Sequence, residues 1–357
     1  MSLPYLQPYL GLSNGLNTLH AAGGPGGGVG GWIELGRSSG AVQLDVSSLP
    51  NKRYYMILTH KPSGSAGMGN YLNGDTGSNY ASRYSSGGGA DTTGTGQTAL
   101  FGAGIYFGDY NEFMVSYIAN YSSKEKLAMM HLVGGNTTGA GNAPQRFEDV
   151  SKWANTSNAI NRIQTQGTMT DANSQMVILG YDPLDSHTNN YWEELASVDW
   201  TSGNTMSTGT IPARKYLWIQ GYFKSATPDF VKMIFNNDTG ANYSYRYNAN
   251  GGTDGTSTSL TRGAFTISGV HSPAFTNHFF INNASTEKLG ISHVVHRNNT
   301  GAGNAPERIE QVDKWSNTSN QITRIDAIMN SGNFSAGYLR VYGANWYERS
   351  WLRNGMG

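Results

Sequence analysis

The chain has 357 residues, with 24 Lys and Arg against 24 Asp and Glu, and it contains no cysteine. Zero net charge provides no field that would attract nucleic acid or an anionic membrane, and the absence of cysteine excludes disulfides and thiolate metal sites. Only 13% of the residues are charged while 47 are glycine, so the composition predicts many tight turns and a neutral polar surface rather than a helical protein.

Residues 1–31 are predicted to form an extended N-terminal arm that ends in a flexible Gly-rich hinge, AAGGPGGGVGG at 21–31. The arm has too many apolar side chains for a free terminus, since each fully buried Leu or Tyr contributes roughly 1.5–3 kcal/mol. We therefore expect it to dock on another protein or on a symmetry-related copy. The predicted docking residues are Leu3, Tyr5, Leu6, Tyr9 and Leu10.

From residue 32 onward the sequence is repeated. The 20 residues that begin at Thr138 share 15 identities with the 20 that begin at Thr300. WIEL at 32 also matches WEEL at 192, and NGDTGSNYASRY at 73 matches NNDTGANYSYRY at 236. This pattern indicates an internal duplication of a whole domain rather than a solenoid repeat. The predicted boundaries are a first repeat at 32–183, a linker at 184–190, a second repeat at 191–344 and a C-terminal tail at 345–357.

Within each repeat, short aromatic and β-branched segments alternate with turns rich in Gly, Asn and Asp, which predicts antiparallel strands. The clearest predicted pairs are 52–60 with 214–223, 125–133 with 287–295, and 174–182 with 337–345. About eight to ten strands are expected per repeat. Segments 158–166 and 320–329 fit either a strand or a helical turn. The predicted fold class is all-β, with two tandem antiparallel β-sandwiches that are jelly-roll-like and follow the extended arm.

One arginine of each repeat is expected to hold a nearby loop. Arg83 is followed by Asp91, and Arg246 is followed at the same spacing by Asp254. A guanidinium group on a sheet face commonly stacks on aromatic rings or pairs with a loop carboxylate. We therefore expect structural roles for both arginines, rather than a ligand clamp.

A second set of repeated residues lies on the strand that ends each conserved block. Arg146 and Arg308 are followed seven residues later by Trp153 and Trp315. Alternate residues of a strand share one face, so each arginine is expected to form an ion pair beside a buried tryptophan. An acid/base pair for catalysis is the less favoured interpretation.

No metal site is predicted. Asp75 and Asp238 lie in Asp-Thr-Gly turns that offer oxygen ligands, but the density of carboxylates is too low for a dedicated calcium loop. They are expected to bond their own backbone instead. His293 and His296 point to opposite faces of a predicted strand, and the first repeat keeps only His131.

No catalytic or cofactor-binding residue is predicted either. The chain has no nucleophile elbow, no phosphate-binding GxxxxGK[ST] motif and no HExxH motif. No apolar run reaches the roughly 20 residues of a membrane span, so no membrane insertion is expected. Nucleic acid is not an expected partner.

The combination of WIELG at 32, the block at 73, the GAGNAP loops and the terminal YLRVYGA at 338 resembles repeats of virion structural proteins from tailed phages of the marine and cyanophage type. The resemblance covers both repeats and implies a place in the virion, as a capsid decoration, knob or short-fibre protein without known catalytic residues. The chain lacks heptads and collagen-like repeats, which favours a compact knob over a long fibre.

The sequence therefore predicts a non-enzymatic virion structural protein that docks by its N-terminal arm and contacts other virion proteins. A homo-oligomer is expected, with a trimer favoured. One alternative is a tandem jelly-roll major capsid protein. Another is an adhesin that binds host surface glycans, with Tyr and Trp stacking on sugars. A glycan hydrolase is the weakest alternative, because no two opposed carboxylates stand out.

Overall fold

The computed structural model describes residues 31–102, 108–135, 137–182, 190–225, 229–266, 273–296, 302 and 305–345. Within these residues the chain forms 23 strands and no helix, which confirms the predicted all-β class. The ambiguous segments 158–166 and 320–329 contribute strands, not helical turns. The predicted docking residues of the arm lie outside the described residues, as do most of the linker and all but the first residue of the tail.

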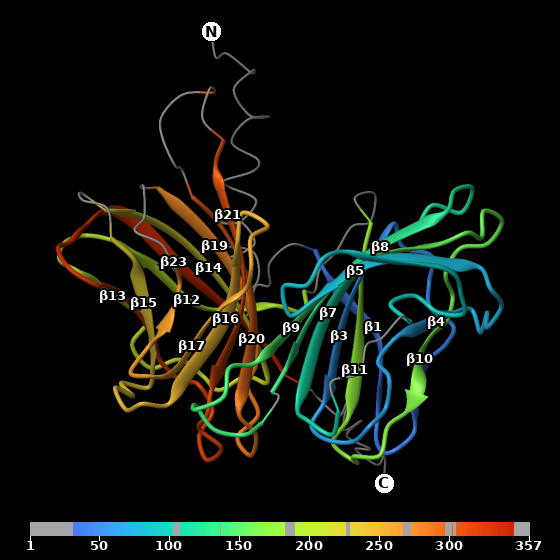
Figure 1. Ribbon diagram of the computed structural model, residues 1–357, viewed down its shortest axis with the longest axis horizontal. Helices are drawn as coiled ribbons and strands as arrows, with labels where there is room; N and C mark the ends of the chain where they lie inside the picture. Colours follow the sequence, from blue (N-terminus) through green and yellow to red (C-terminus); the bar gives the residue numbers. More distant parts are fainter. Residues whose placement is uncertain are drawn as a thin grey trace, which may run out of the picture.

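The first repeat contains two antiparallel sheets (Figure 1). Its large sheet consists, in spatial order, of β1 (Ile33–Ser39), β11 (Gln175–Tyr181), β3 (Tyr54–Lys61), β7 (Glu112–Ala119), β8 (Lys126–Gly134), β9 (Gln145–Trp153), β5 (Tyr80–Ser86) and β6 (Thr92–Gln97). Its small sheet consists of β2 (Gln43–Val46), β10 (Ile163–Thr168) and β4 (Asn70–Leu72).

The second repeat has the same plan. Its large sheet consists, in spatial order, of β12 (Glu193–Asp199), β23 (Phe334–Ala344), β14 (Tyr216–Ser225), β19 (Ala274–Ile281), β20 (Lys288–His296), β21 (Glu307–Trp315), β16 (Tyr243–Ala249) and β17 (Gly255–Leu260). Its small sheet consists of β13 (Thr205–Ser207), β22 (Ile325–Met329), β15 (Val231–Phe235) and β18 (Gly263–Ala264). Each strand of one large sheet has a counterpart at the same place in the other.

The described part of each repeat has more strands than the expected eight to ten, with 11 in the first and 12 in the second. The surplus comes from the short strands of the small sheets, several of which have only two to four residues. Such segments are too short to show the alternation of apolar and polar residues on which strand prediction depends.

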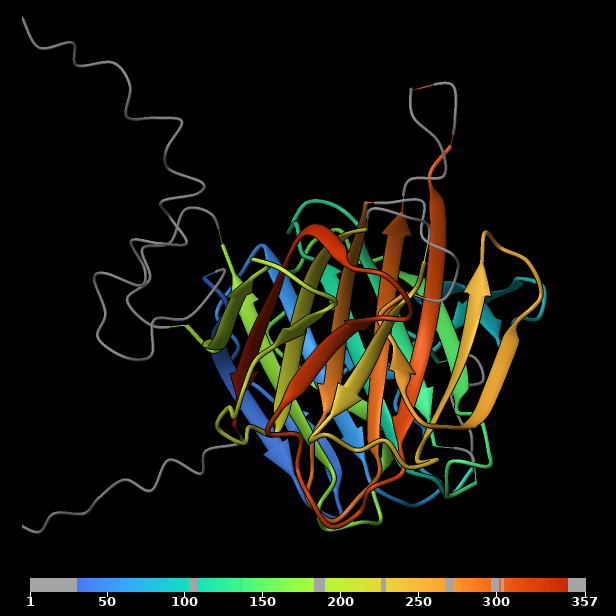
Figure 2. The same ribbon diagram turned by 90° about the vertical axis from the view of Figure 1, so that its left-hand side faces the viewer.

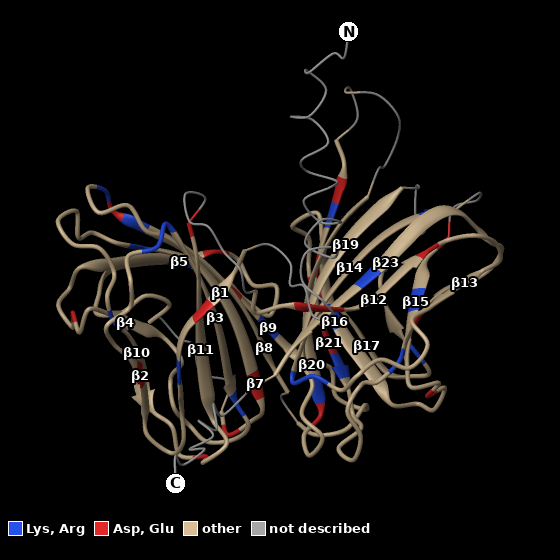
Figure 3. Ribbon diagram, turned by 180° about the vertical axis from the view of Figure 1, so that it is seen from behind, with Lys and Arg blue, Asp and Glu red and all other residues tan. Residues whose placement is uncertain are grey.

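Each repeat buries an apolar core between its large and its small sheet. The two small sheets lie on the outer sides of the molecule, and the two large sheets face each other across the middle (Figure 1). Seen from the side of the second repeat, its strands lie in front of those of the first (Figure 2). Charged residues are sparse over both sandwiches (Figure 3).

Strand β3 shows why the large sheets are apolar on both faces. Tyr55 and Ile57 point into the core of the first repeat, whereas Met56 and Leu58 belong to a third core shared by the two repeats. Successive side chains of a strand point to opposite faces, so a strand covered on both faces reads as a continuous apolar run. The run YYMIL at 54–58 is therefore the local signal of two packing layers.

Candidate docking site

The two repeats are joined by an apolar core between their large sheets. The first repeat contributes seven buried residues and the second contributes nine. Rings from the two repeats meet there, with the centroids of Phe113 and Tyr216 6.2 Å apart. The contributing residues are Met56, Leu58, Phe113, Val115, Val133, Val177 and Leu179 from the first repeat, and Trp192, Tyr216, Phe279, Ile281, Leu289, Ile291, Val312, Tyr342 and Ala344 from the second.

The loop between β8 and β9 is held by polar side chains of the second repeat. Lys314 Nζ donates to the carbonyl oxygens of Gly135 at 3.1 Å and Thr137 at 2.8 Å. Gly139 N donates to Glu287 Oε1 at 2.6 Å. These bonds satisfy backbone groups of a loop that would otherwise need water, and they fix its position on the second repeat.

Arg146 is the centre of a buried ion network between the repeats. Its guanidinium group contacts Glu148 on its own strand, Asp254 at 2.8 Å and Glu310 at 3.3 Å. Burial, followed by the neighbouring Glu148 carboxyl, raises the pKa of Glu310 to about 7. The predicted ion pair on this strand face is present, and two of its three partners come from the other repeat.

Two histidines at counterpart positions meet beside this network. His131 Nε2 and His293 Nε2 are 3.0 Å apart, so one ring donates and the other accepts. Burial lowers the pKa of His131 to about 4, and burial with the nearby His131 ring lowers that of His293 to about 3. Both rings are therefore neutral at pH 7. Their contact could not be predicted from local sequence, because the two histidines lie 162 residues apart.

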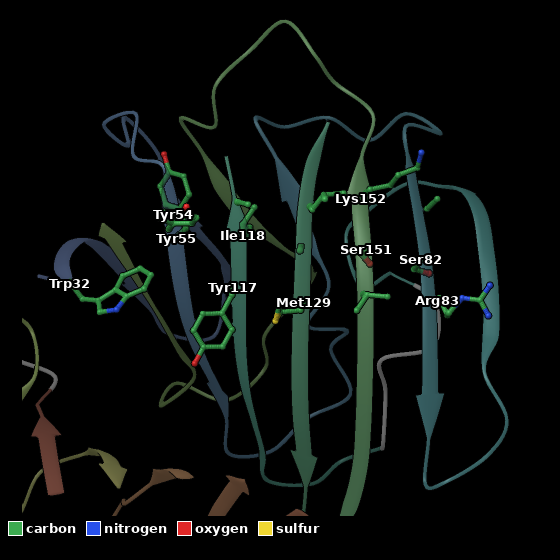
Figure 4. Close-up of a pocket in the computed structure, with 15 residues that line it drawn as sticks. Trp32, Tyr54, Tyr55, Ser82, Arg83, Tyr117, Ile118, Met129, Ser151 and Lys152 are labelled. Atoms are coloured by element: carbon green, nitrogen blue, oxygen red, sulfur yellow. The ribbon is translucent and has the colours of Figure 1, made fainter. Parts of the chain in front are cut away.

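The part of the first repeat's large sheet beyond this contact is open. It forms a broad apolar depression of about 710 Å³, with Trp32, Tyr54 and Tyr117 on one side, Met129 in the middle and Lys152 on the far rim (Figure 4). The exposed apolar residues, with their exposed fractions, are Tyr54 37%, Leu127 60%, Met129 53% and Val150 55%. We call the surface formed by these four residues and Tyr117 the open face.

The open face has a counterpart in the second repeat that is covered. Residues 162 positions further along the chain are Tyr216, Phe279, Leu289, Ile291 and Val312. All five are buried in the core between the repeats. Apolar exposure on this scale at the centre of a sheet is typical of a protein-binding surface. The open face is thus the first repeat's copy of the surface with which the second repeat binds the first.

The other predicted repeat arginines lie within ion-pair distance of nearby carboxylates. Arg83 lies 3.6 Å from Asp91 and Arg246 lies 3.7 Å from Asp254, so each arginine pairs with the loop carboxylate. Arg308 contacts Glu310 at 3.2 Å.

Both predicted tryptophans are buried against an Asp-Thr-Gly turn. Trp153 Nε1 donates to Asp75 Oδ2 and Trp315 Nε1 donates to Asp238 Oδ2, each at 2.7 Å. Each aspartate also accepts a bond from the glycine N–H two residues later, at 2.9 Å, as the turn interpretation predicts. The tryptophan partner of each aspartate was not foreseen, because it lies some 77 or 78 residues away.

Sequence reasoning missed the residues of the open face. The signal was available in segments 52–60 and 125–133, where apolar residues occupy both faces of the predicted strand. Such a pattern calls for a third layer over the sandwich. It does not say which half of the face that layer covers.

No protein-family model matches this chain, and no curated protein matches it. Within the residues that the structure describes, no helix is long and apolar enough to cross a membrane. In the same residues, His, Asp and Glu form no group of three or more that could hold a metal ion.

Proposed function

We propose that the chain is a non-enzymatic structural protein of a virus particle that docks on other proteins through the open face. The observation that carries the proposal is the contrast between Leu127, which is 60% exposed, and Leu289, its fully buried counterpart. The first repeat covers this surface of the second repeat, so the same surface of the first repeat suits a protein partner. The resemblance of both repeats to virion structural proteins supports a place in the particle as a decoration, knob or short-fibre protein.

The duplication and the arm belong to the same proposal. The equal strand order of the two large sheets supports an origin by internal duplication of a jelly-roll-like sandwich. The arm, with Leu3, Tyr5, Leu6, Tyr9 and Leu10, attaches the protein to the particle together with the open face, and the body assembles as a homo-oligomer, with a trimer favoured.

Immunogold labelling of purified particles of the virus that encodes the chain tests the location. Label on the particle surface is expected, and particles without label would refute the proposal. The variant Leu127→Glu places a charge on the open face and is expected to abolish incorporation. Val42→Glu, at a residue that is also exposed but lies outside this face, is the matched control and is expected to incorporate normally.

A glycan-binding function is the second candidate, because Trp32, Tyr54 and Tyr117 lie together at one side of the open face (Figure 4). Aromatic rings on an exposed surface stack on sugars. A glycan array with the purified chain tests this function. Binding that is lost in Trp32→Ala and retained in Leu127→Glu would favour the adhesin over the docking protein.

A further inference from the structure

We infer that the open face binds the second repeat of another copy of the chain, in a head-to-tail repetition of the contact between the two repeats of one chain. The inference rests on the proposed function in one respect, that the open face is a protein-docking surface, and it names the partner. Within one chain, the second repeat packs its own copy of this face against the first repeat. The free copy of the face, on the first repeat, is left to receive a second repeat from elsewhere.

The polar groups that receive the loop within the chain are kept beside the open face. In the second repeat Lys314 and Glu287 bind the backbone of the loop between β8 and β9. Their counterparts are Lys152 and Glu125, which pair with each other at 3.1 Å and are both exposed. An exposed pair of this kind contributes little stability on its own, so it exchanges partners at little cost.

A third receiving group is also kept. Arg246 Nε donates to the carbonyl oxygen of Pro144 in the same loop at 2.9 Å. Its counterpart Arg83 lines the open face and pairs with Asp91 at the surface. The first repeat therefore has counterparts of the two cations and the carboxylate with which the second repeat binds this loop.

The sequence of the loop that these groups bind occurs twice in the chain. Residues 138–144 read TGAGNAP, and residues 300–306 read TGAGNAP as well. In the first repeat this loop contacts the second repeat by its backbone, since the Ala140 oxygen accepts from Ser259 N at 2.7 Å. Backbone contacts of this type require the glycine-rich sequence to keep its turns, and the second repeat retains every residue of it. The second repeat thus retains the sequence of the segment that these groups bind within the chain.

An aromatic pair shows the same relation. Phe113 of the first repeat packs on Tyr216 of the second within the chain. Their counterparts are Phe275 in the second repeat and Tyr54 in the first, and both remain more than a third exposed. Head-to-tail association places Phe275 of one copy on Tyr54 of the next and buries both rings.

The contact between copies is weaker than the contact within the chain. Where the first repeat buries Leu58, Val115 and Val177, the second repeat has Gln220, Asn277 and Arg340. Less apolar surface is removed from water, so the chain folds as a monomer and associates in a second step. A head-to-tail contact joins two different surfaces and closes into a cyclic oligomer when the rotation allows.

The test uses the absence of cysteine from the chain. Tyr54→Cys and Phe275→Cys are made as separate single variants, because both side chains are exposed and neither change should disturb folding. The two proteins are mixed and treated with a short bismaleimide, since a disulfide would demand a closer approach of the backbones, within about 7 Å. Val42→Cys replaces Tyr54→Cys in the control mixture.

A cross-linked dimer is expected in the mixture of Tyr54→Cys with Phe275→Cys, at least ~10-fold above either variant alone or the control mixture, because docked thiols have a millimolar local concentration. A dimer from Tyr54→Cys alone would show two open faces packed on each other and would overturn the inference. Equal yields in all mixtures would also overturn it, and deletion of 1–22 would then show whether the arm covers the face.

The two proposals fail separately. If Leu127→Glu prevents incorporation into particles but the mixed variants do not cross-link, the open face docks on a different virion protein and only the inference falls. If the mixed variants cross-link but particles carry no immunogold label, the self-association stands and the virion function falls.

Discussion

The ion network between the repeats allows a quantitative prediction, for the substitution Arg146→Ala. The side chain of Arg146 is only 4% exposed and contacts three carboxyl groups, on Glu148, Asp254 and Glu310. Its removal leaves these groups close together in a site with little water. Glu310 already has a raised pKa of about 7, which shows that the site disfavours negative charge even with the arginine present.

Breaking a buried ion pair by removing one partner costs about 3–5 kcal/mol, because the remaining charge is uncompensated. Protonation of Glu310 relieves part of this cost at neutral pH, so we expect the lower end of the range. The expected loss for Arg146→Ala is about 3 kcal/mol of unfolding free energy.

Arg308→Ala is the matched control. Arg308 is the counterpart of Arg146 in the second repeat, but its side chain is 59% exposed, and Glu310 is its ion-pair partner at 3.2 Å. Exposed pairs contribute about 0–1 kcal/mol, so the expected loss is within that range. The two variants delete the same side chain from the same strand position and differ in burial.

Denaturant unfolding followed by tryptophan fluorescence measures both losses, since Trp153 and Trp315 report on the two repeats and are both buried. Arg146→Ala is also expected to separate the unfolding of the two repeats into two steps. Equal losses in the two variants, or a loss under about 1 kcal/mol for Arg146→Ala, would refute the argument that this network holds the repeats together.

Three further predictions follow from single sites. The pKa values of His131 and His293 are lowered to about 4 and about 3, so below pH 6.5 the unfolded chain binds more protons than the folded chain, and stability is lost as the pH falls. The drop in melting temperature between about pH 7.5 and about pH 5 should therefore shrink when both histidines are replaced by Gln. An unchanged drop would contradict this prediction. Gly88→Ala should lower the melting temperature more than Gly251→Ala. Both glycines have a positive φ, but only a Cβ at position 88 would collide with a carboxyl group of the other repeat, that of Asp254. Equal losses would mean that backbone strain alone acts. A chelator should leave the melting temperature unchanged, because the Asp75 carboxylate is held by hydrogen bonds within the chain, and a drop reversed by calcium would make Asp75 a ligand.

Much of each sandwich could be predicted from local sequence. The turn at Asp75 was recognised because an Asp followed two residues later by Gly bonds its own backbone, whatever surrounds it. The strand at 52–60 was recognised because aromatic and β-branched residues fill it, and the structure places β3 there. These features depend on neighbours within a few residues.

Contacts between distant residues could not be predicted in the same way. The bond from Trp153 to Asp75, the pairing of His131 with His293 and the ion network at Arg146 all join segments brought together by packing. Sequence reasoning placed Arg146 on a strand face beside a tryptophan, which is correct, but the identity of two of its partners depends on how the second repeat lies against the first.

Local sequence was enough to predict an all-β chain, one pattern repeated at 32–183 and 191–344, and strands such as 125–133 and 287–295 with apolar residues on both faces. Which copy of that second face is covered depends on how the two repeats pack against each other. Leu127 in β8 and Leu289 in β20 are leucines at the same position of counterpart strands, yet one is 60% exposed and the other is fully buried. The physical reason is that burial on the outer face of a sheet depends on the rotation that relates the two repeats, and this rotation is set by contacts between residues more than a hundred positions apart rather than by local pattern.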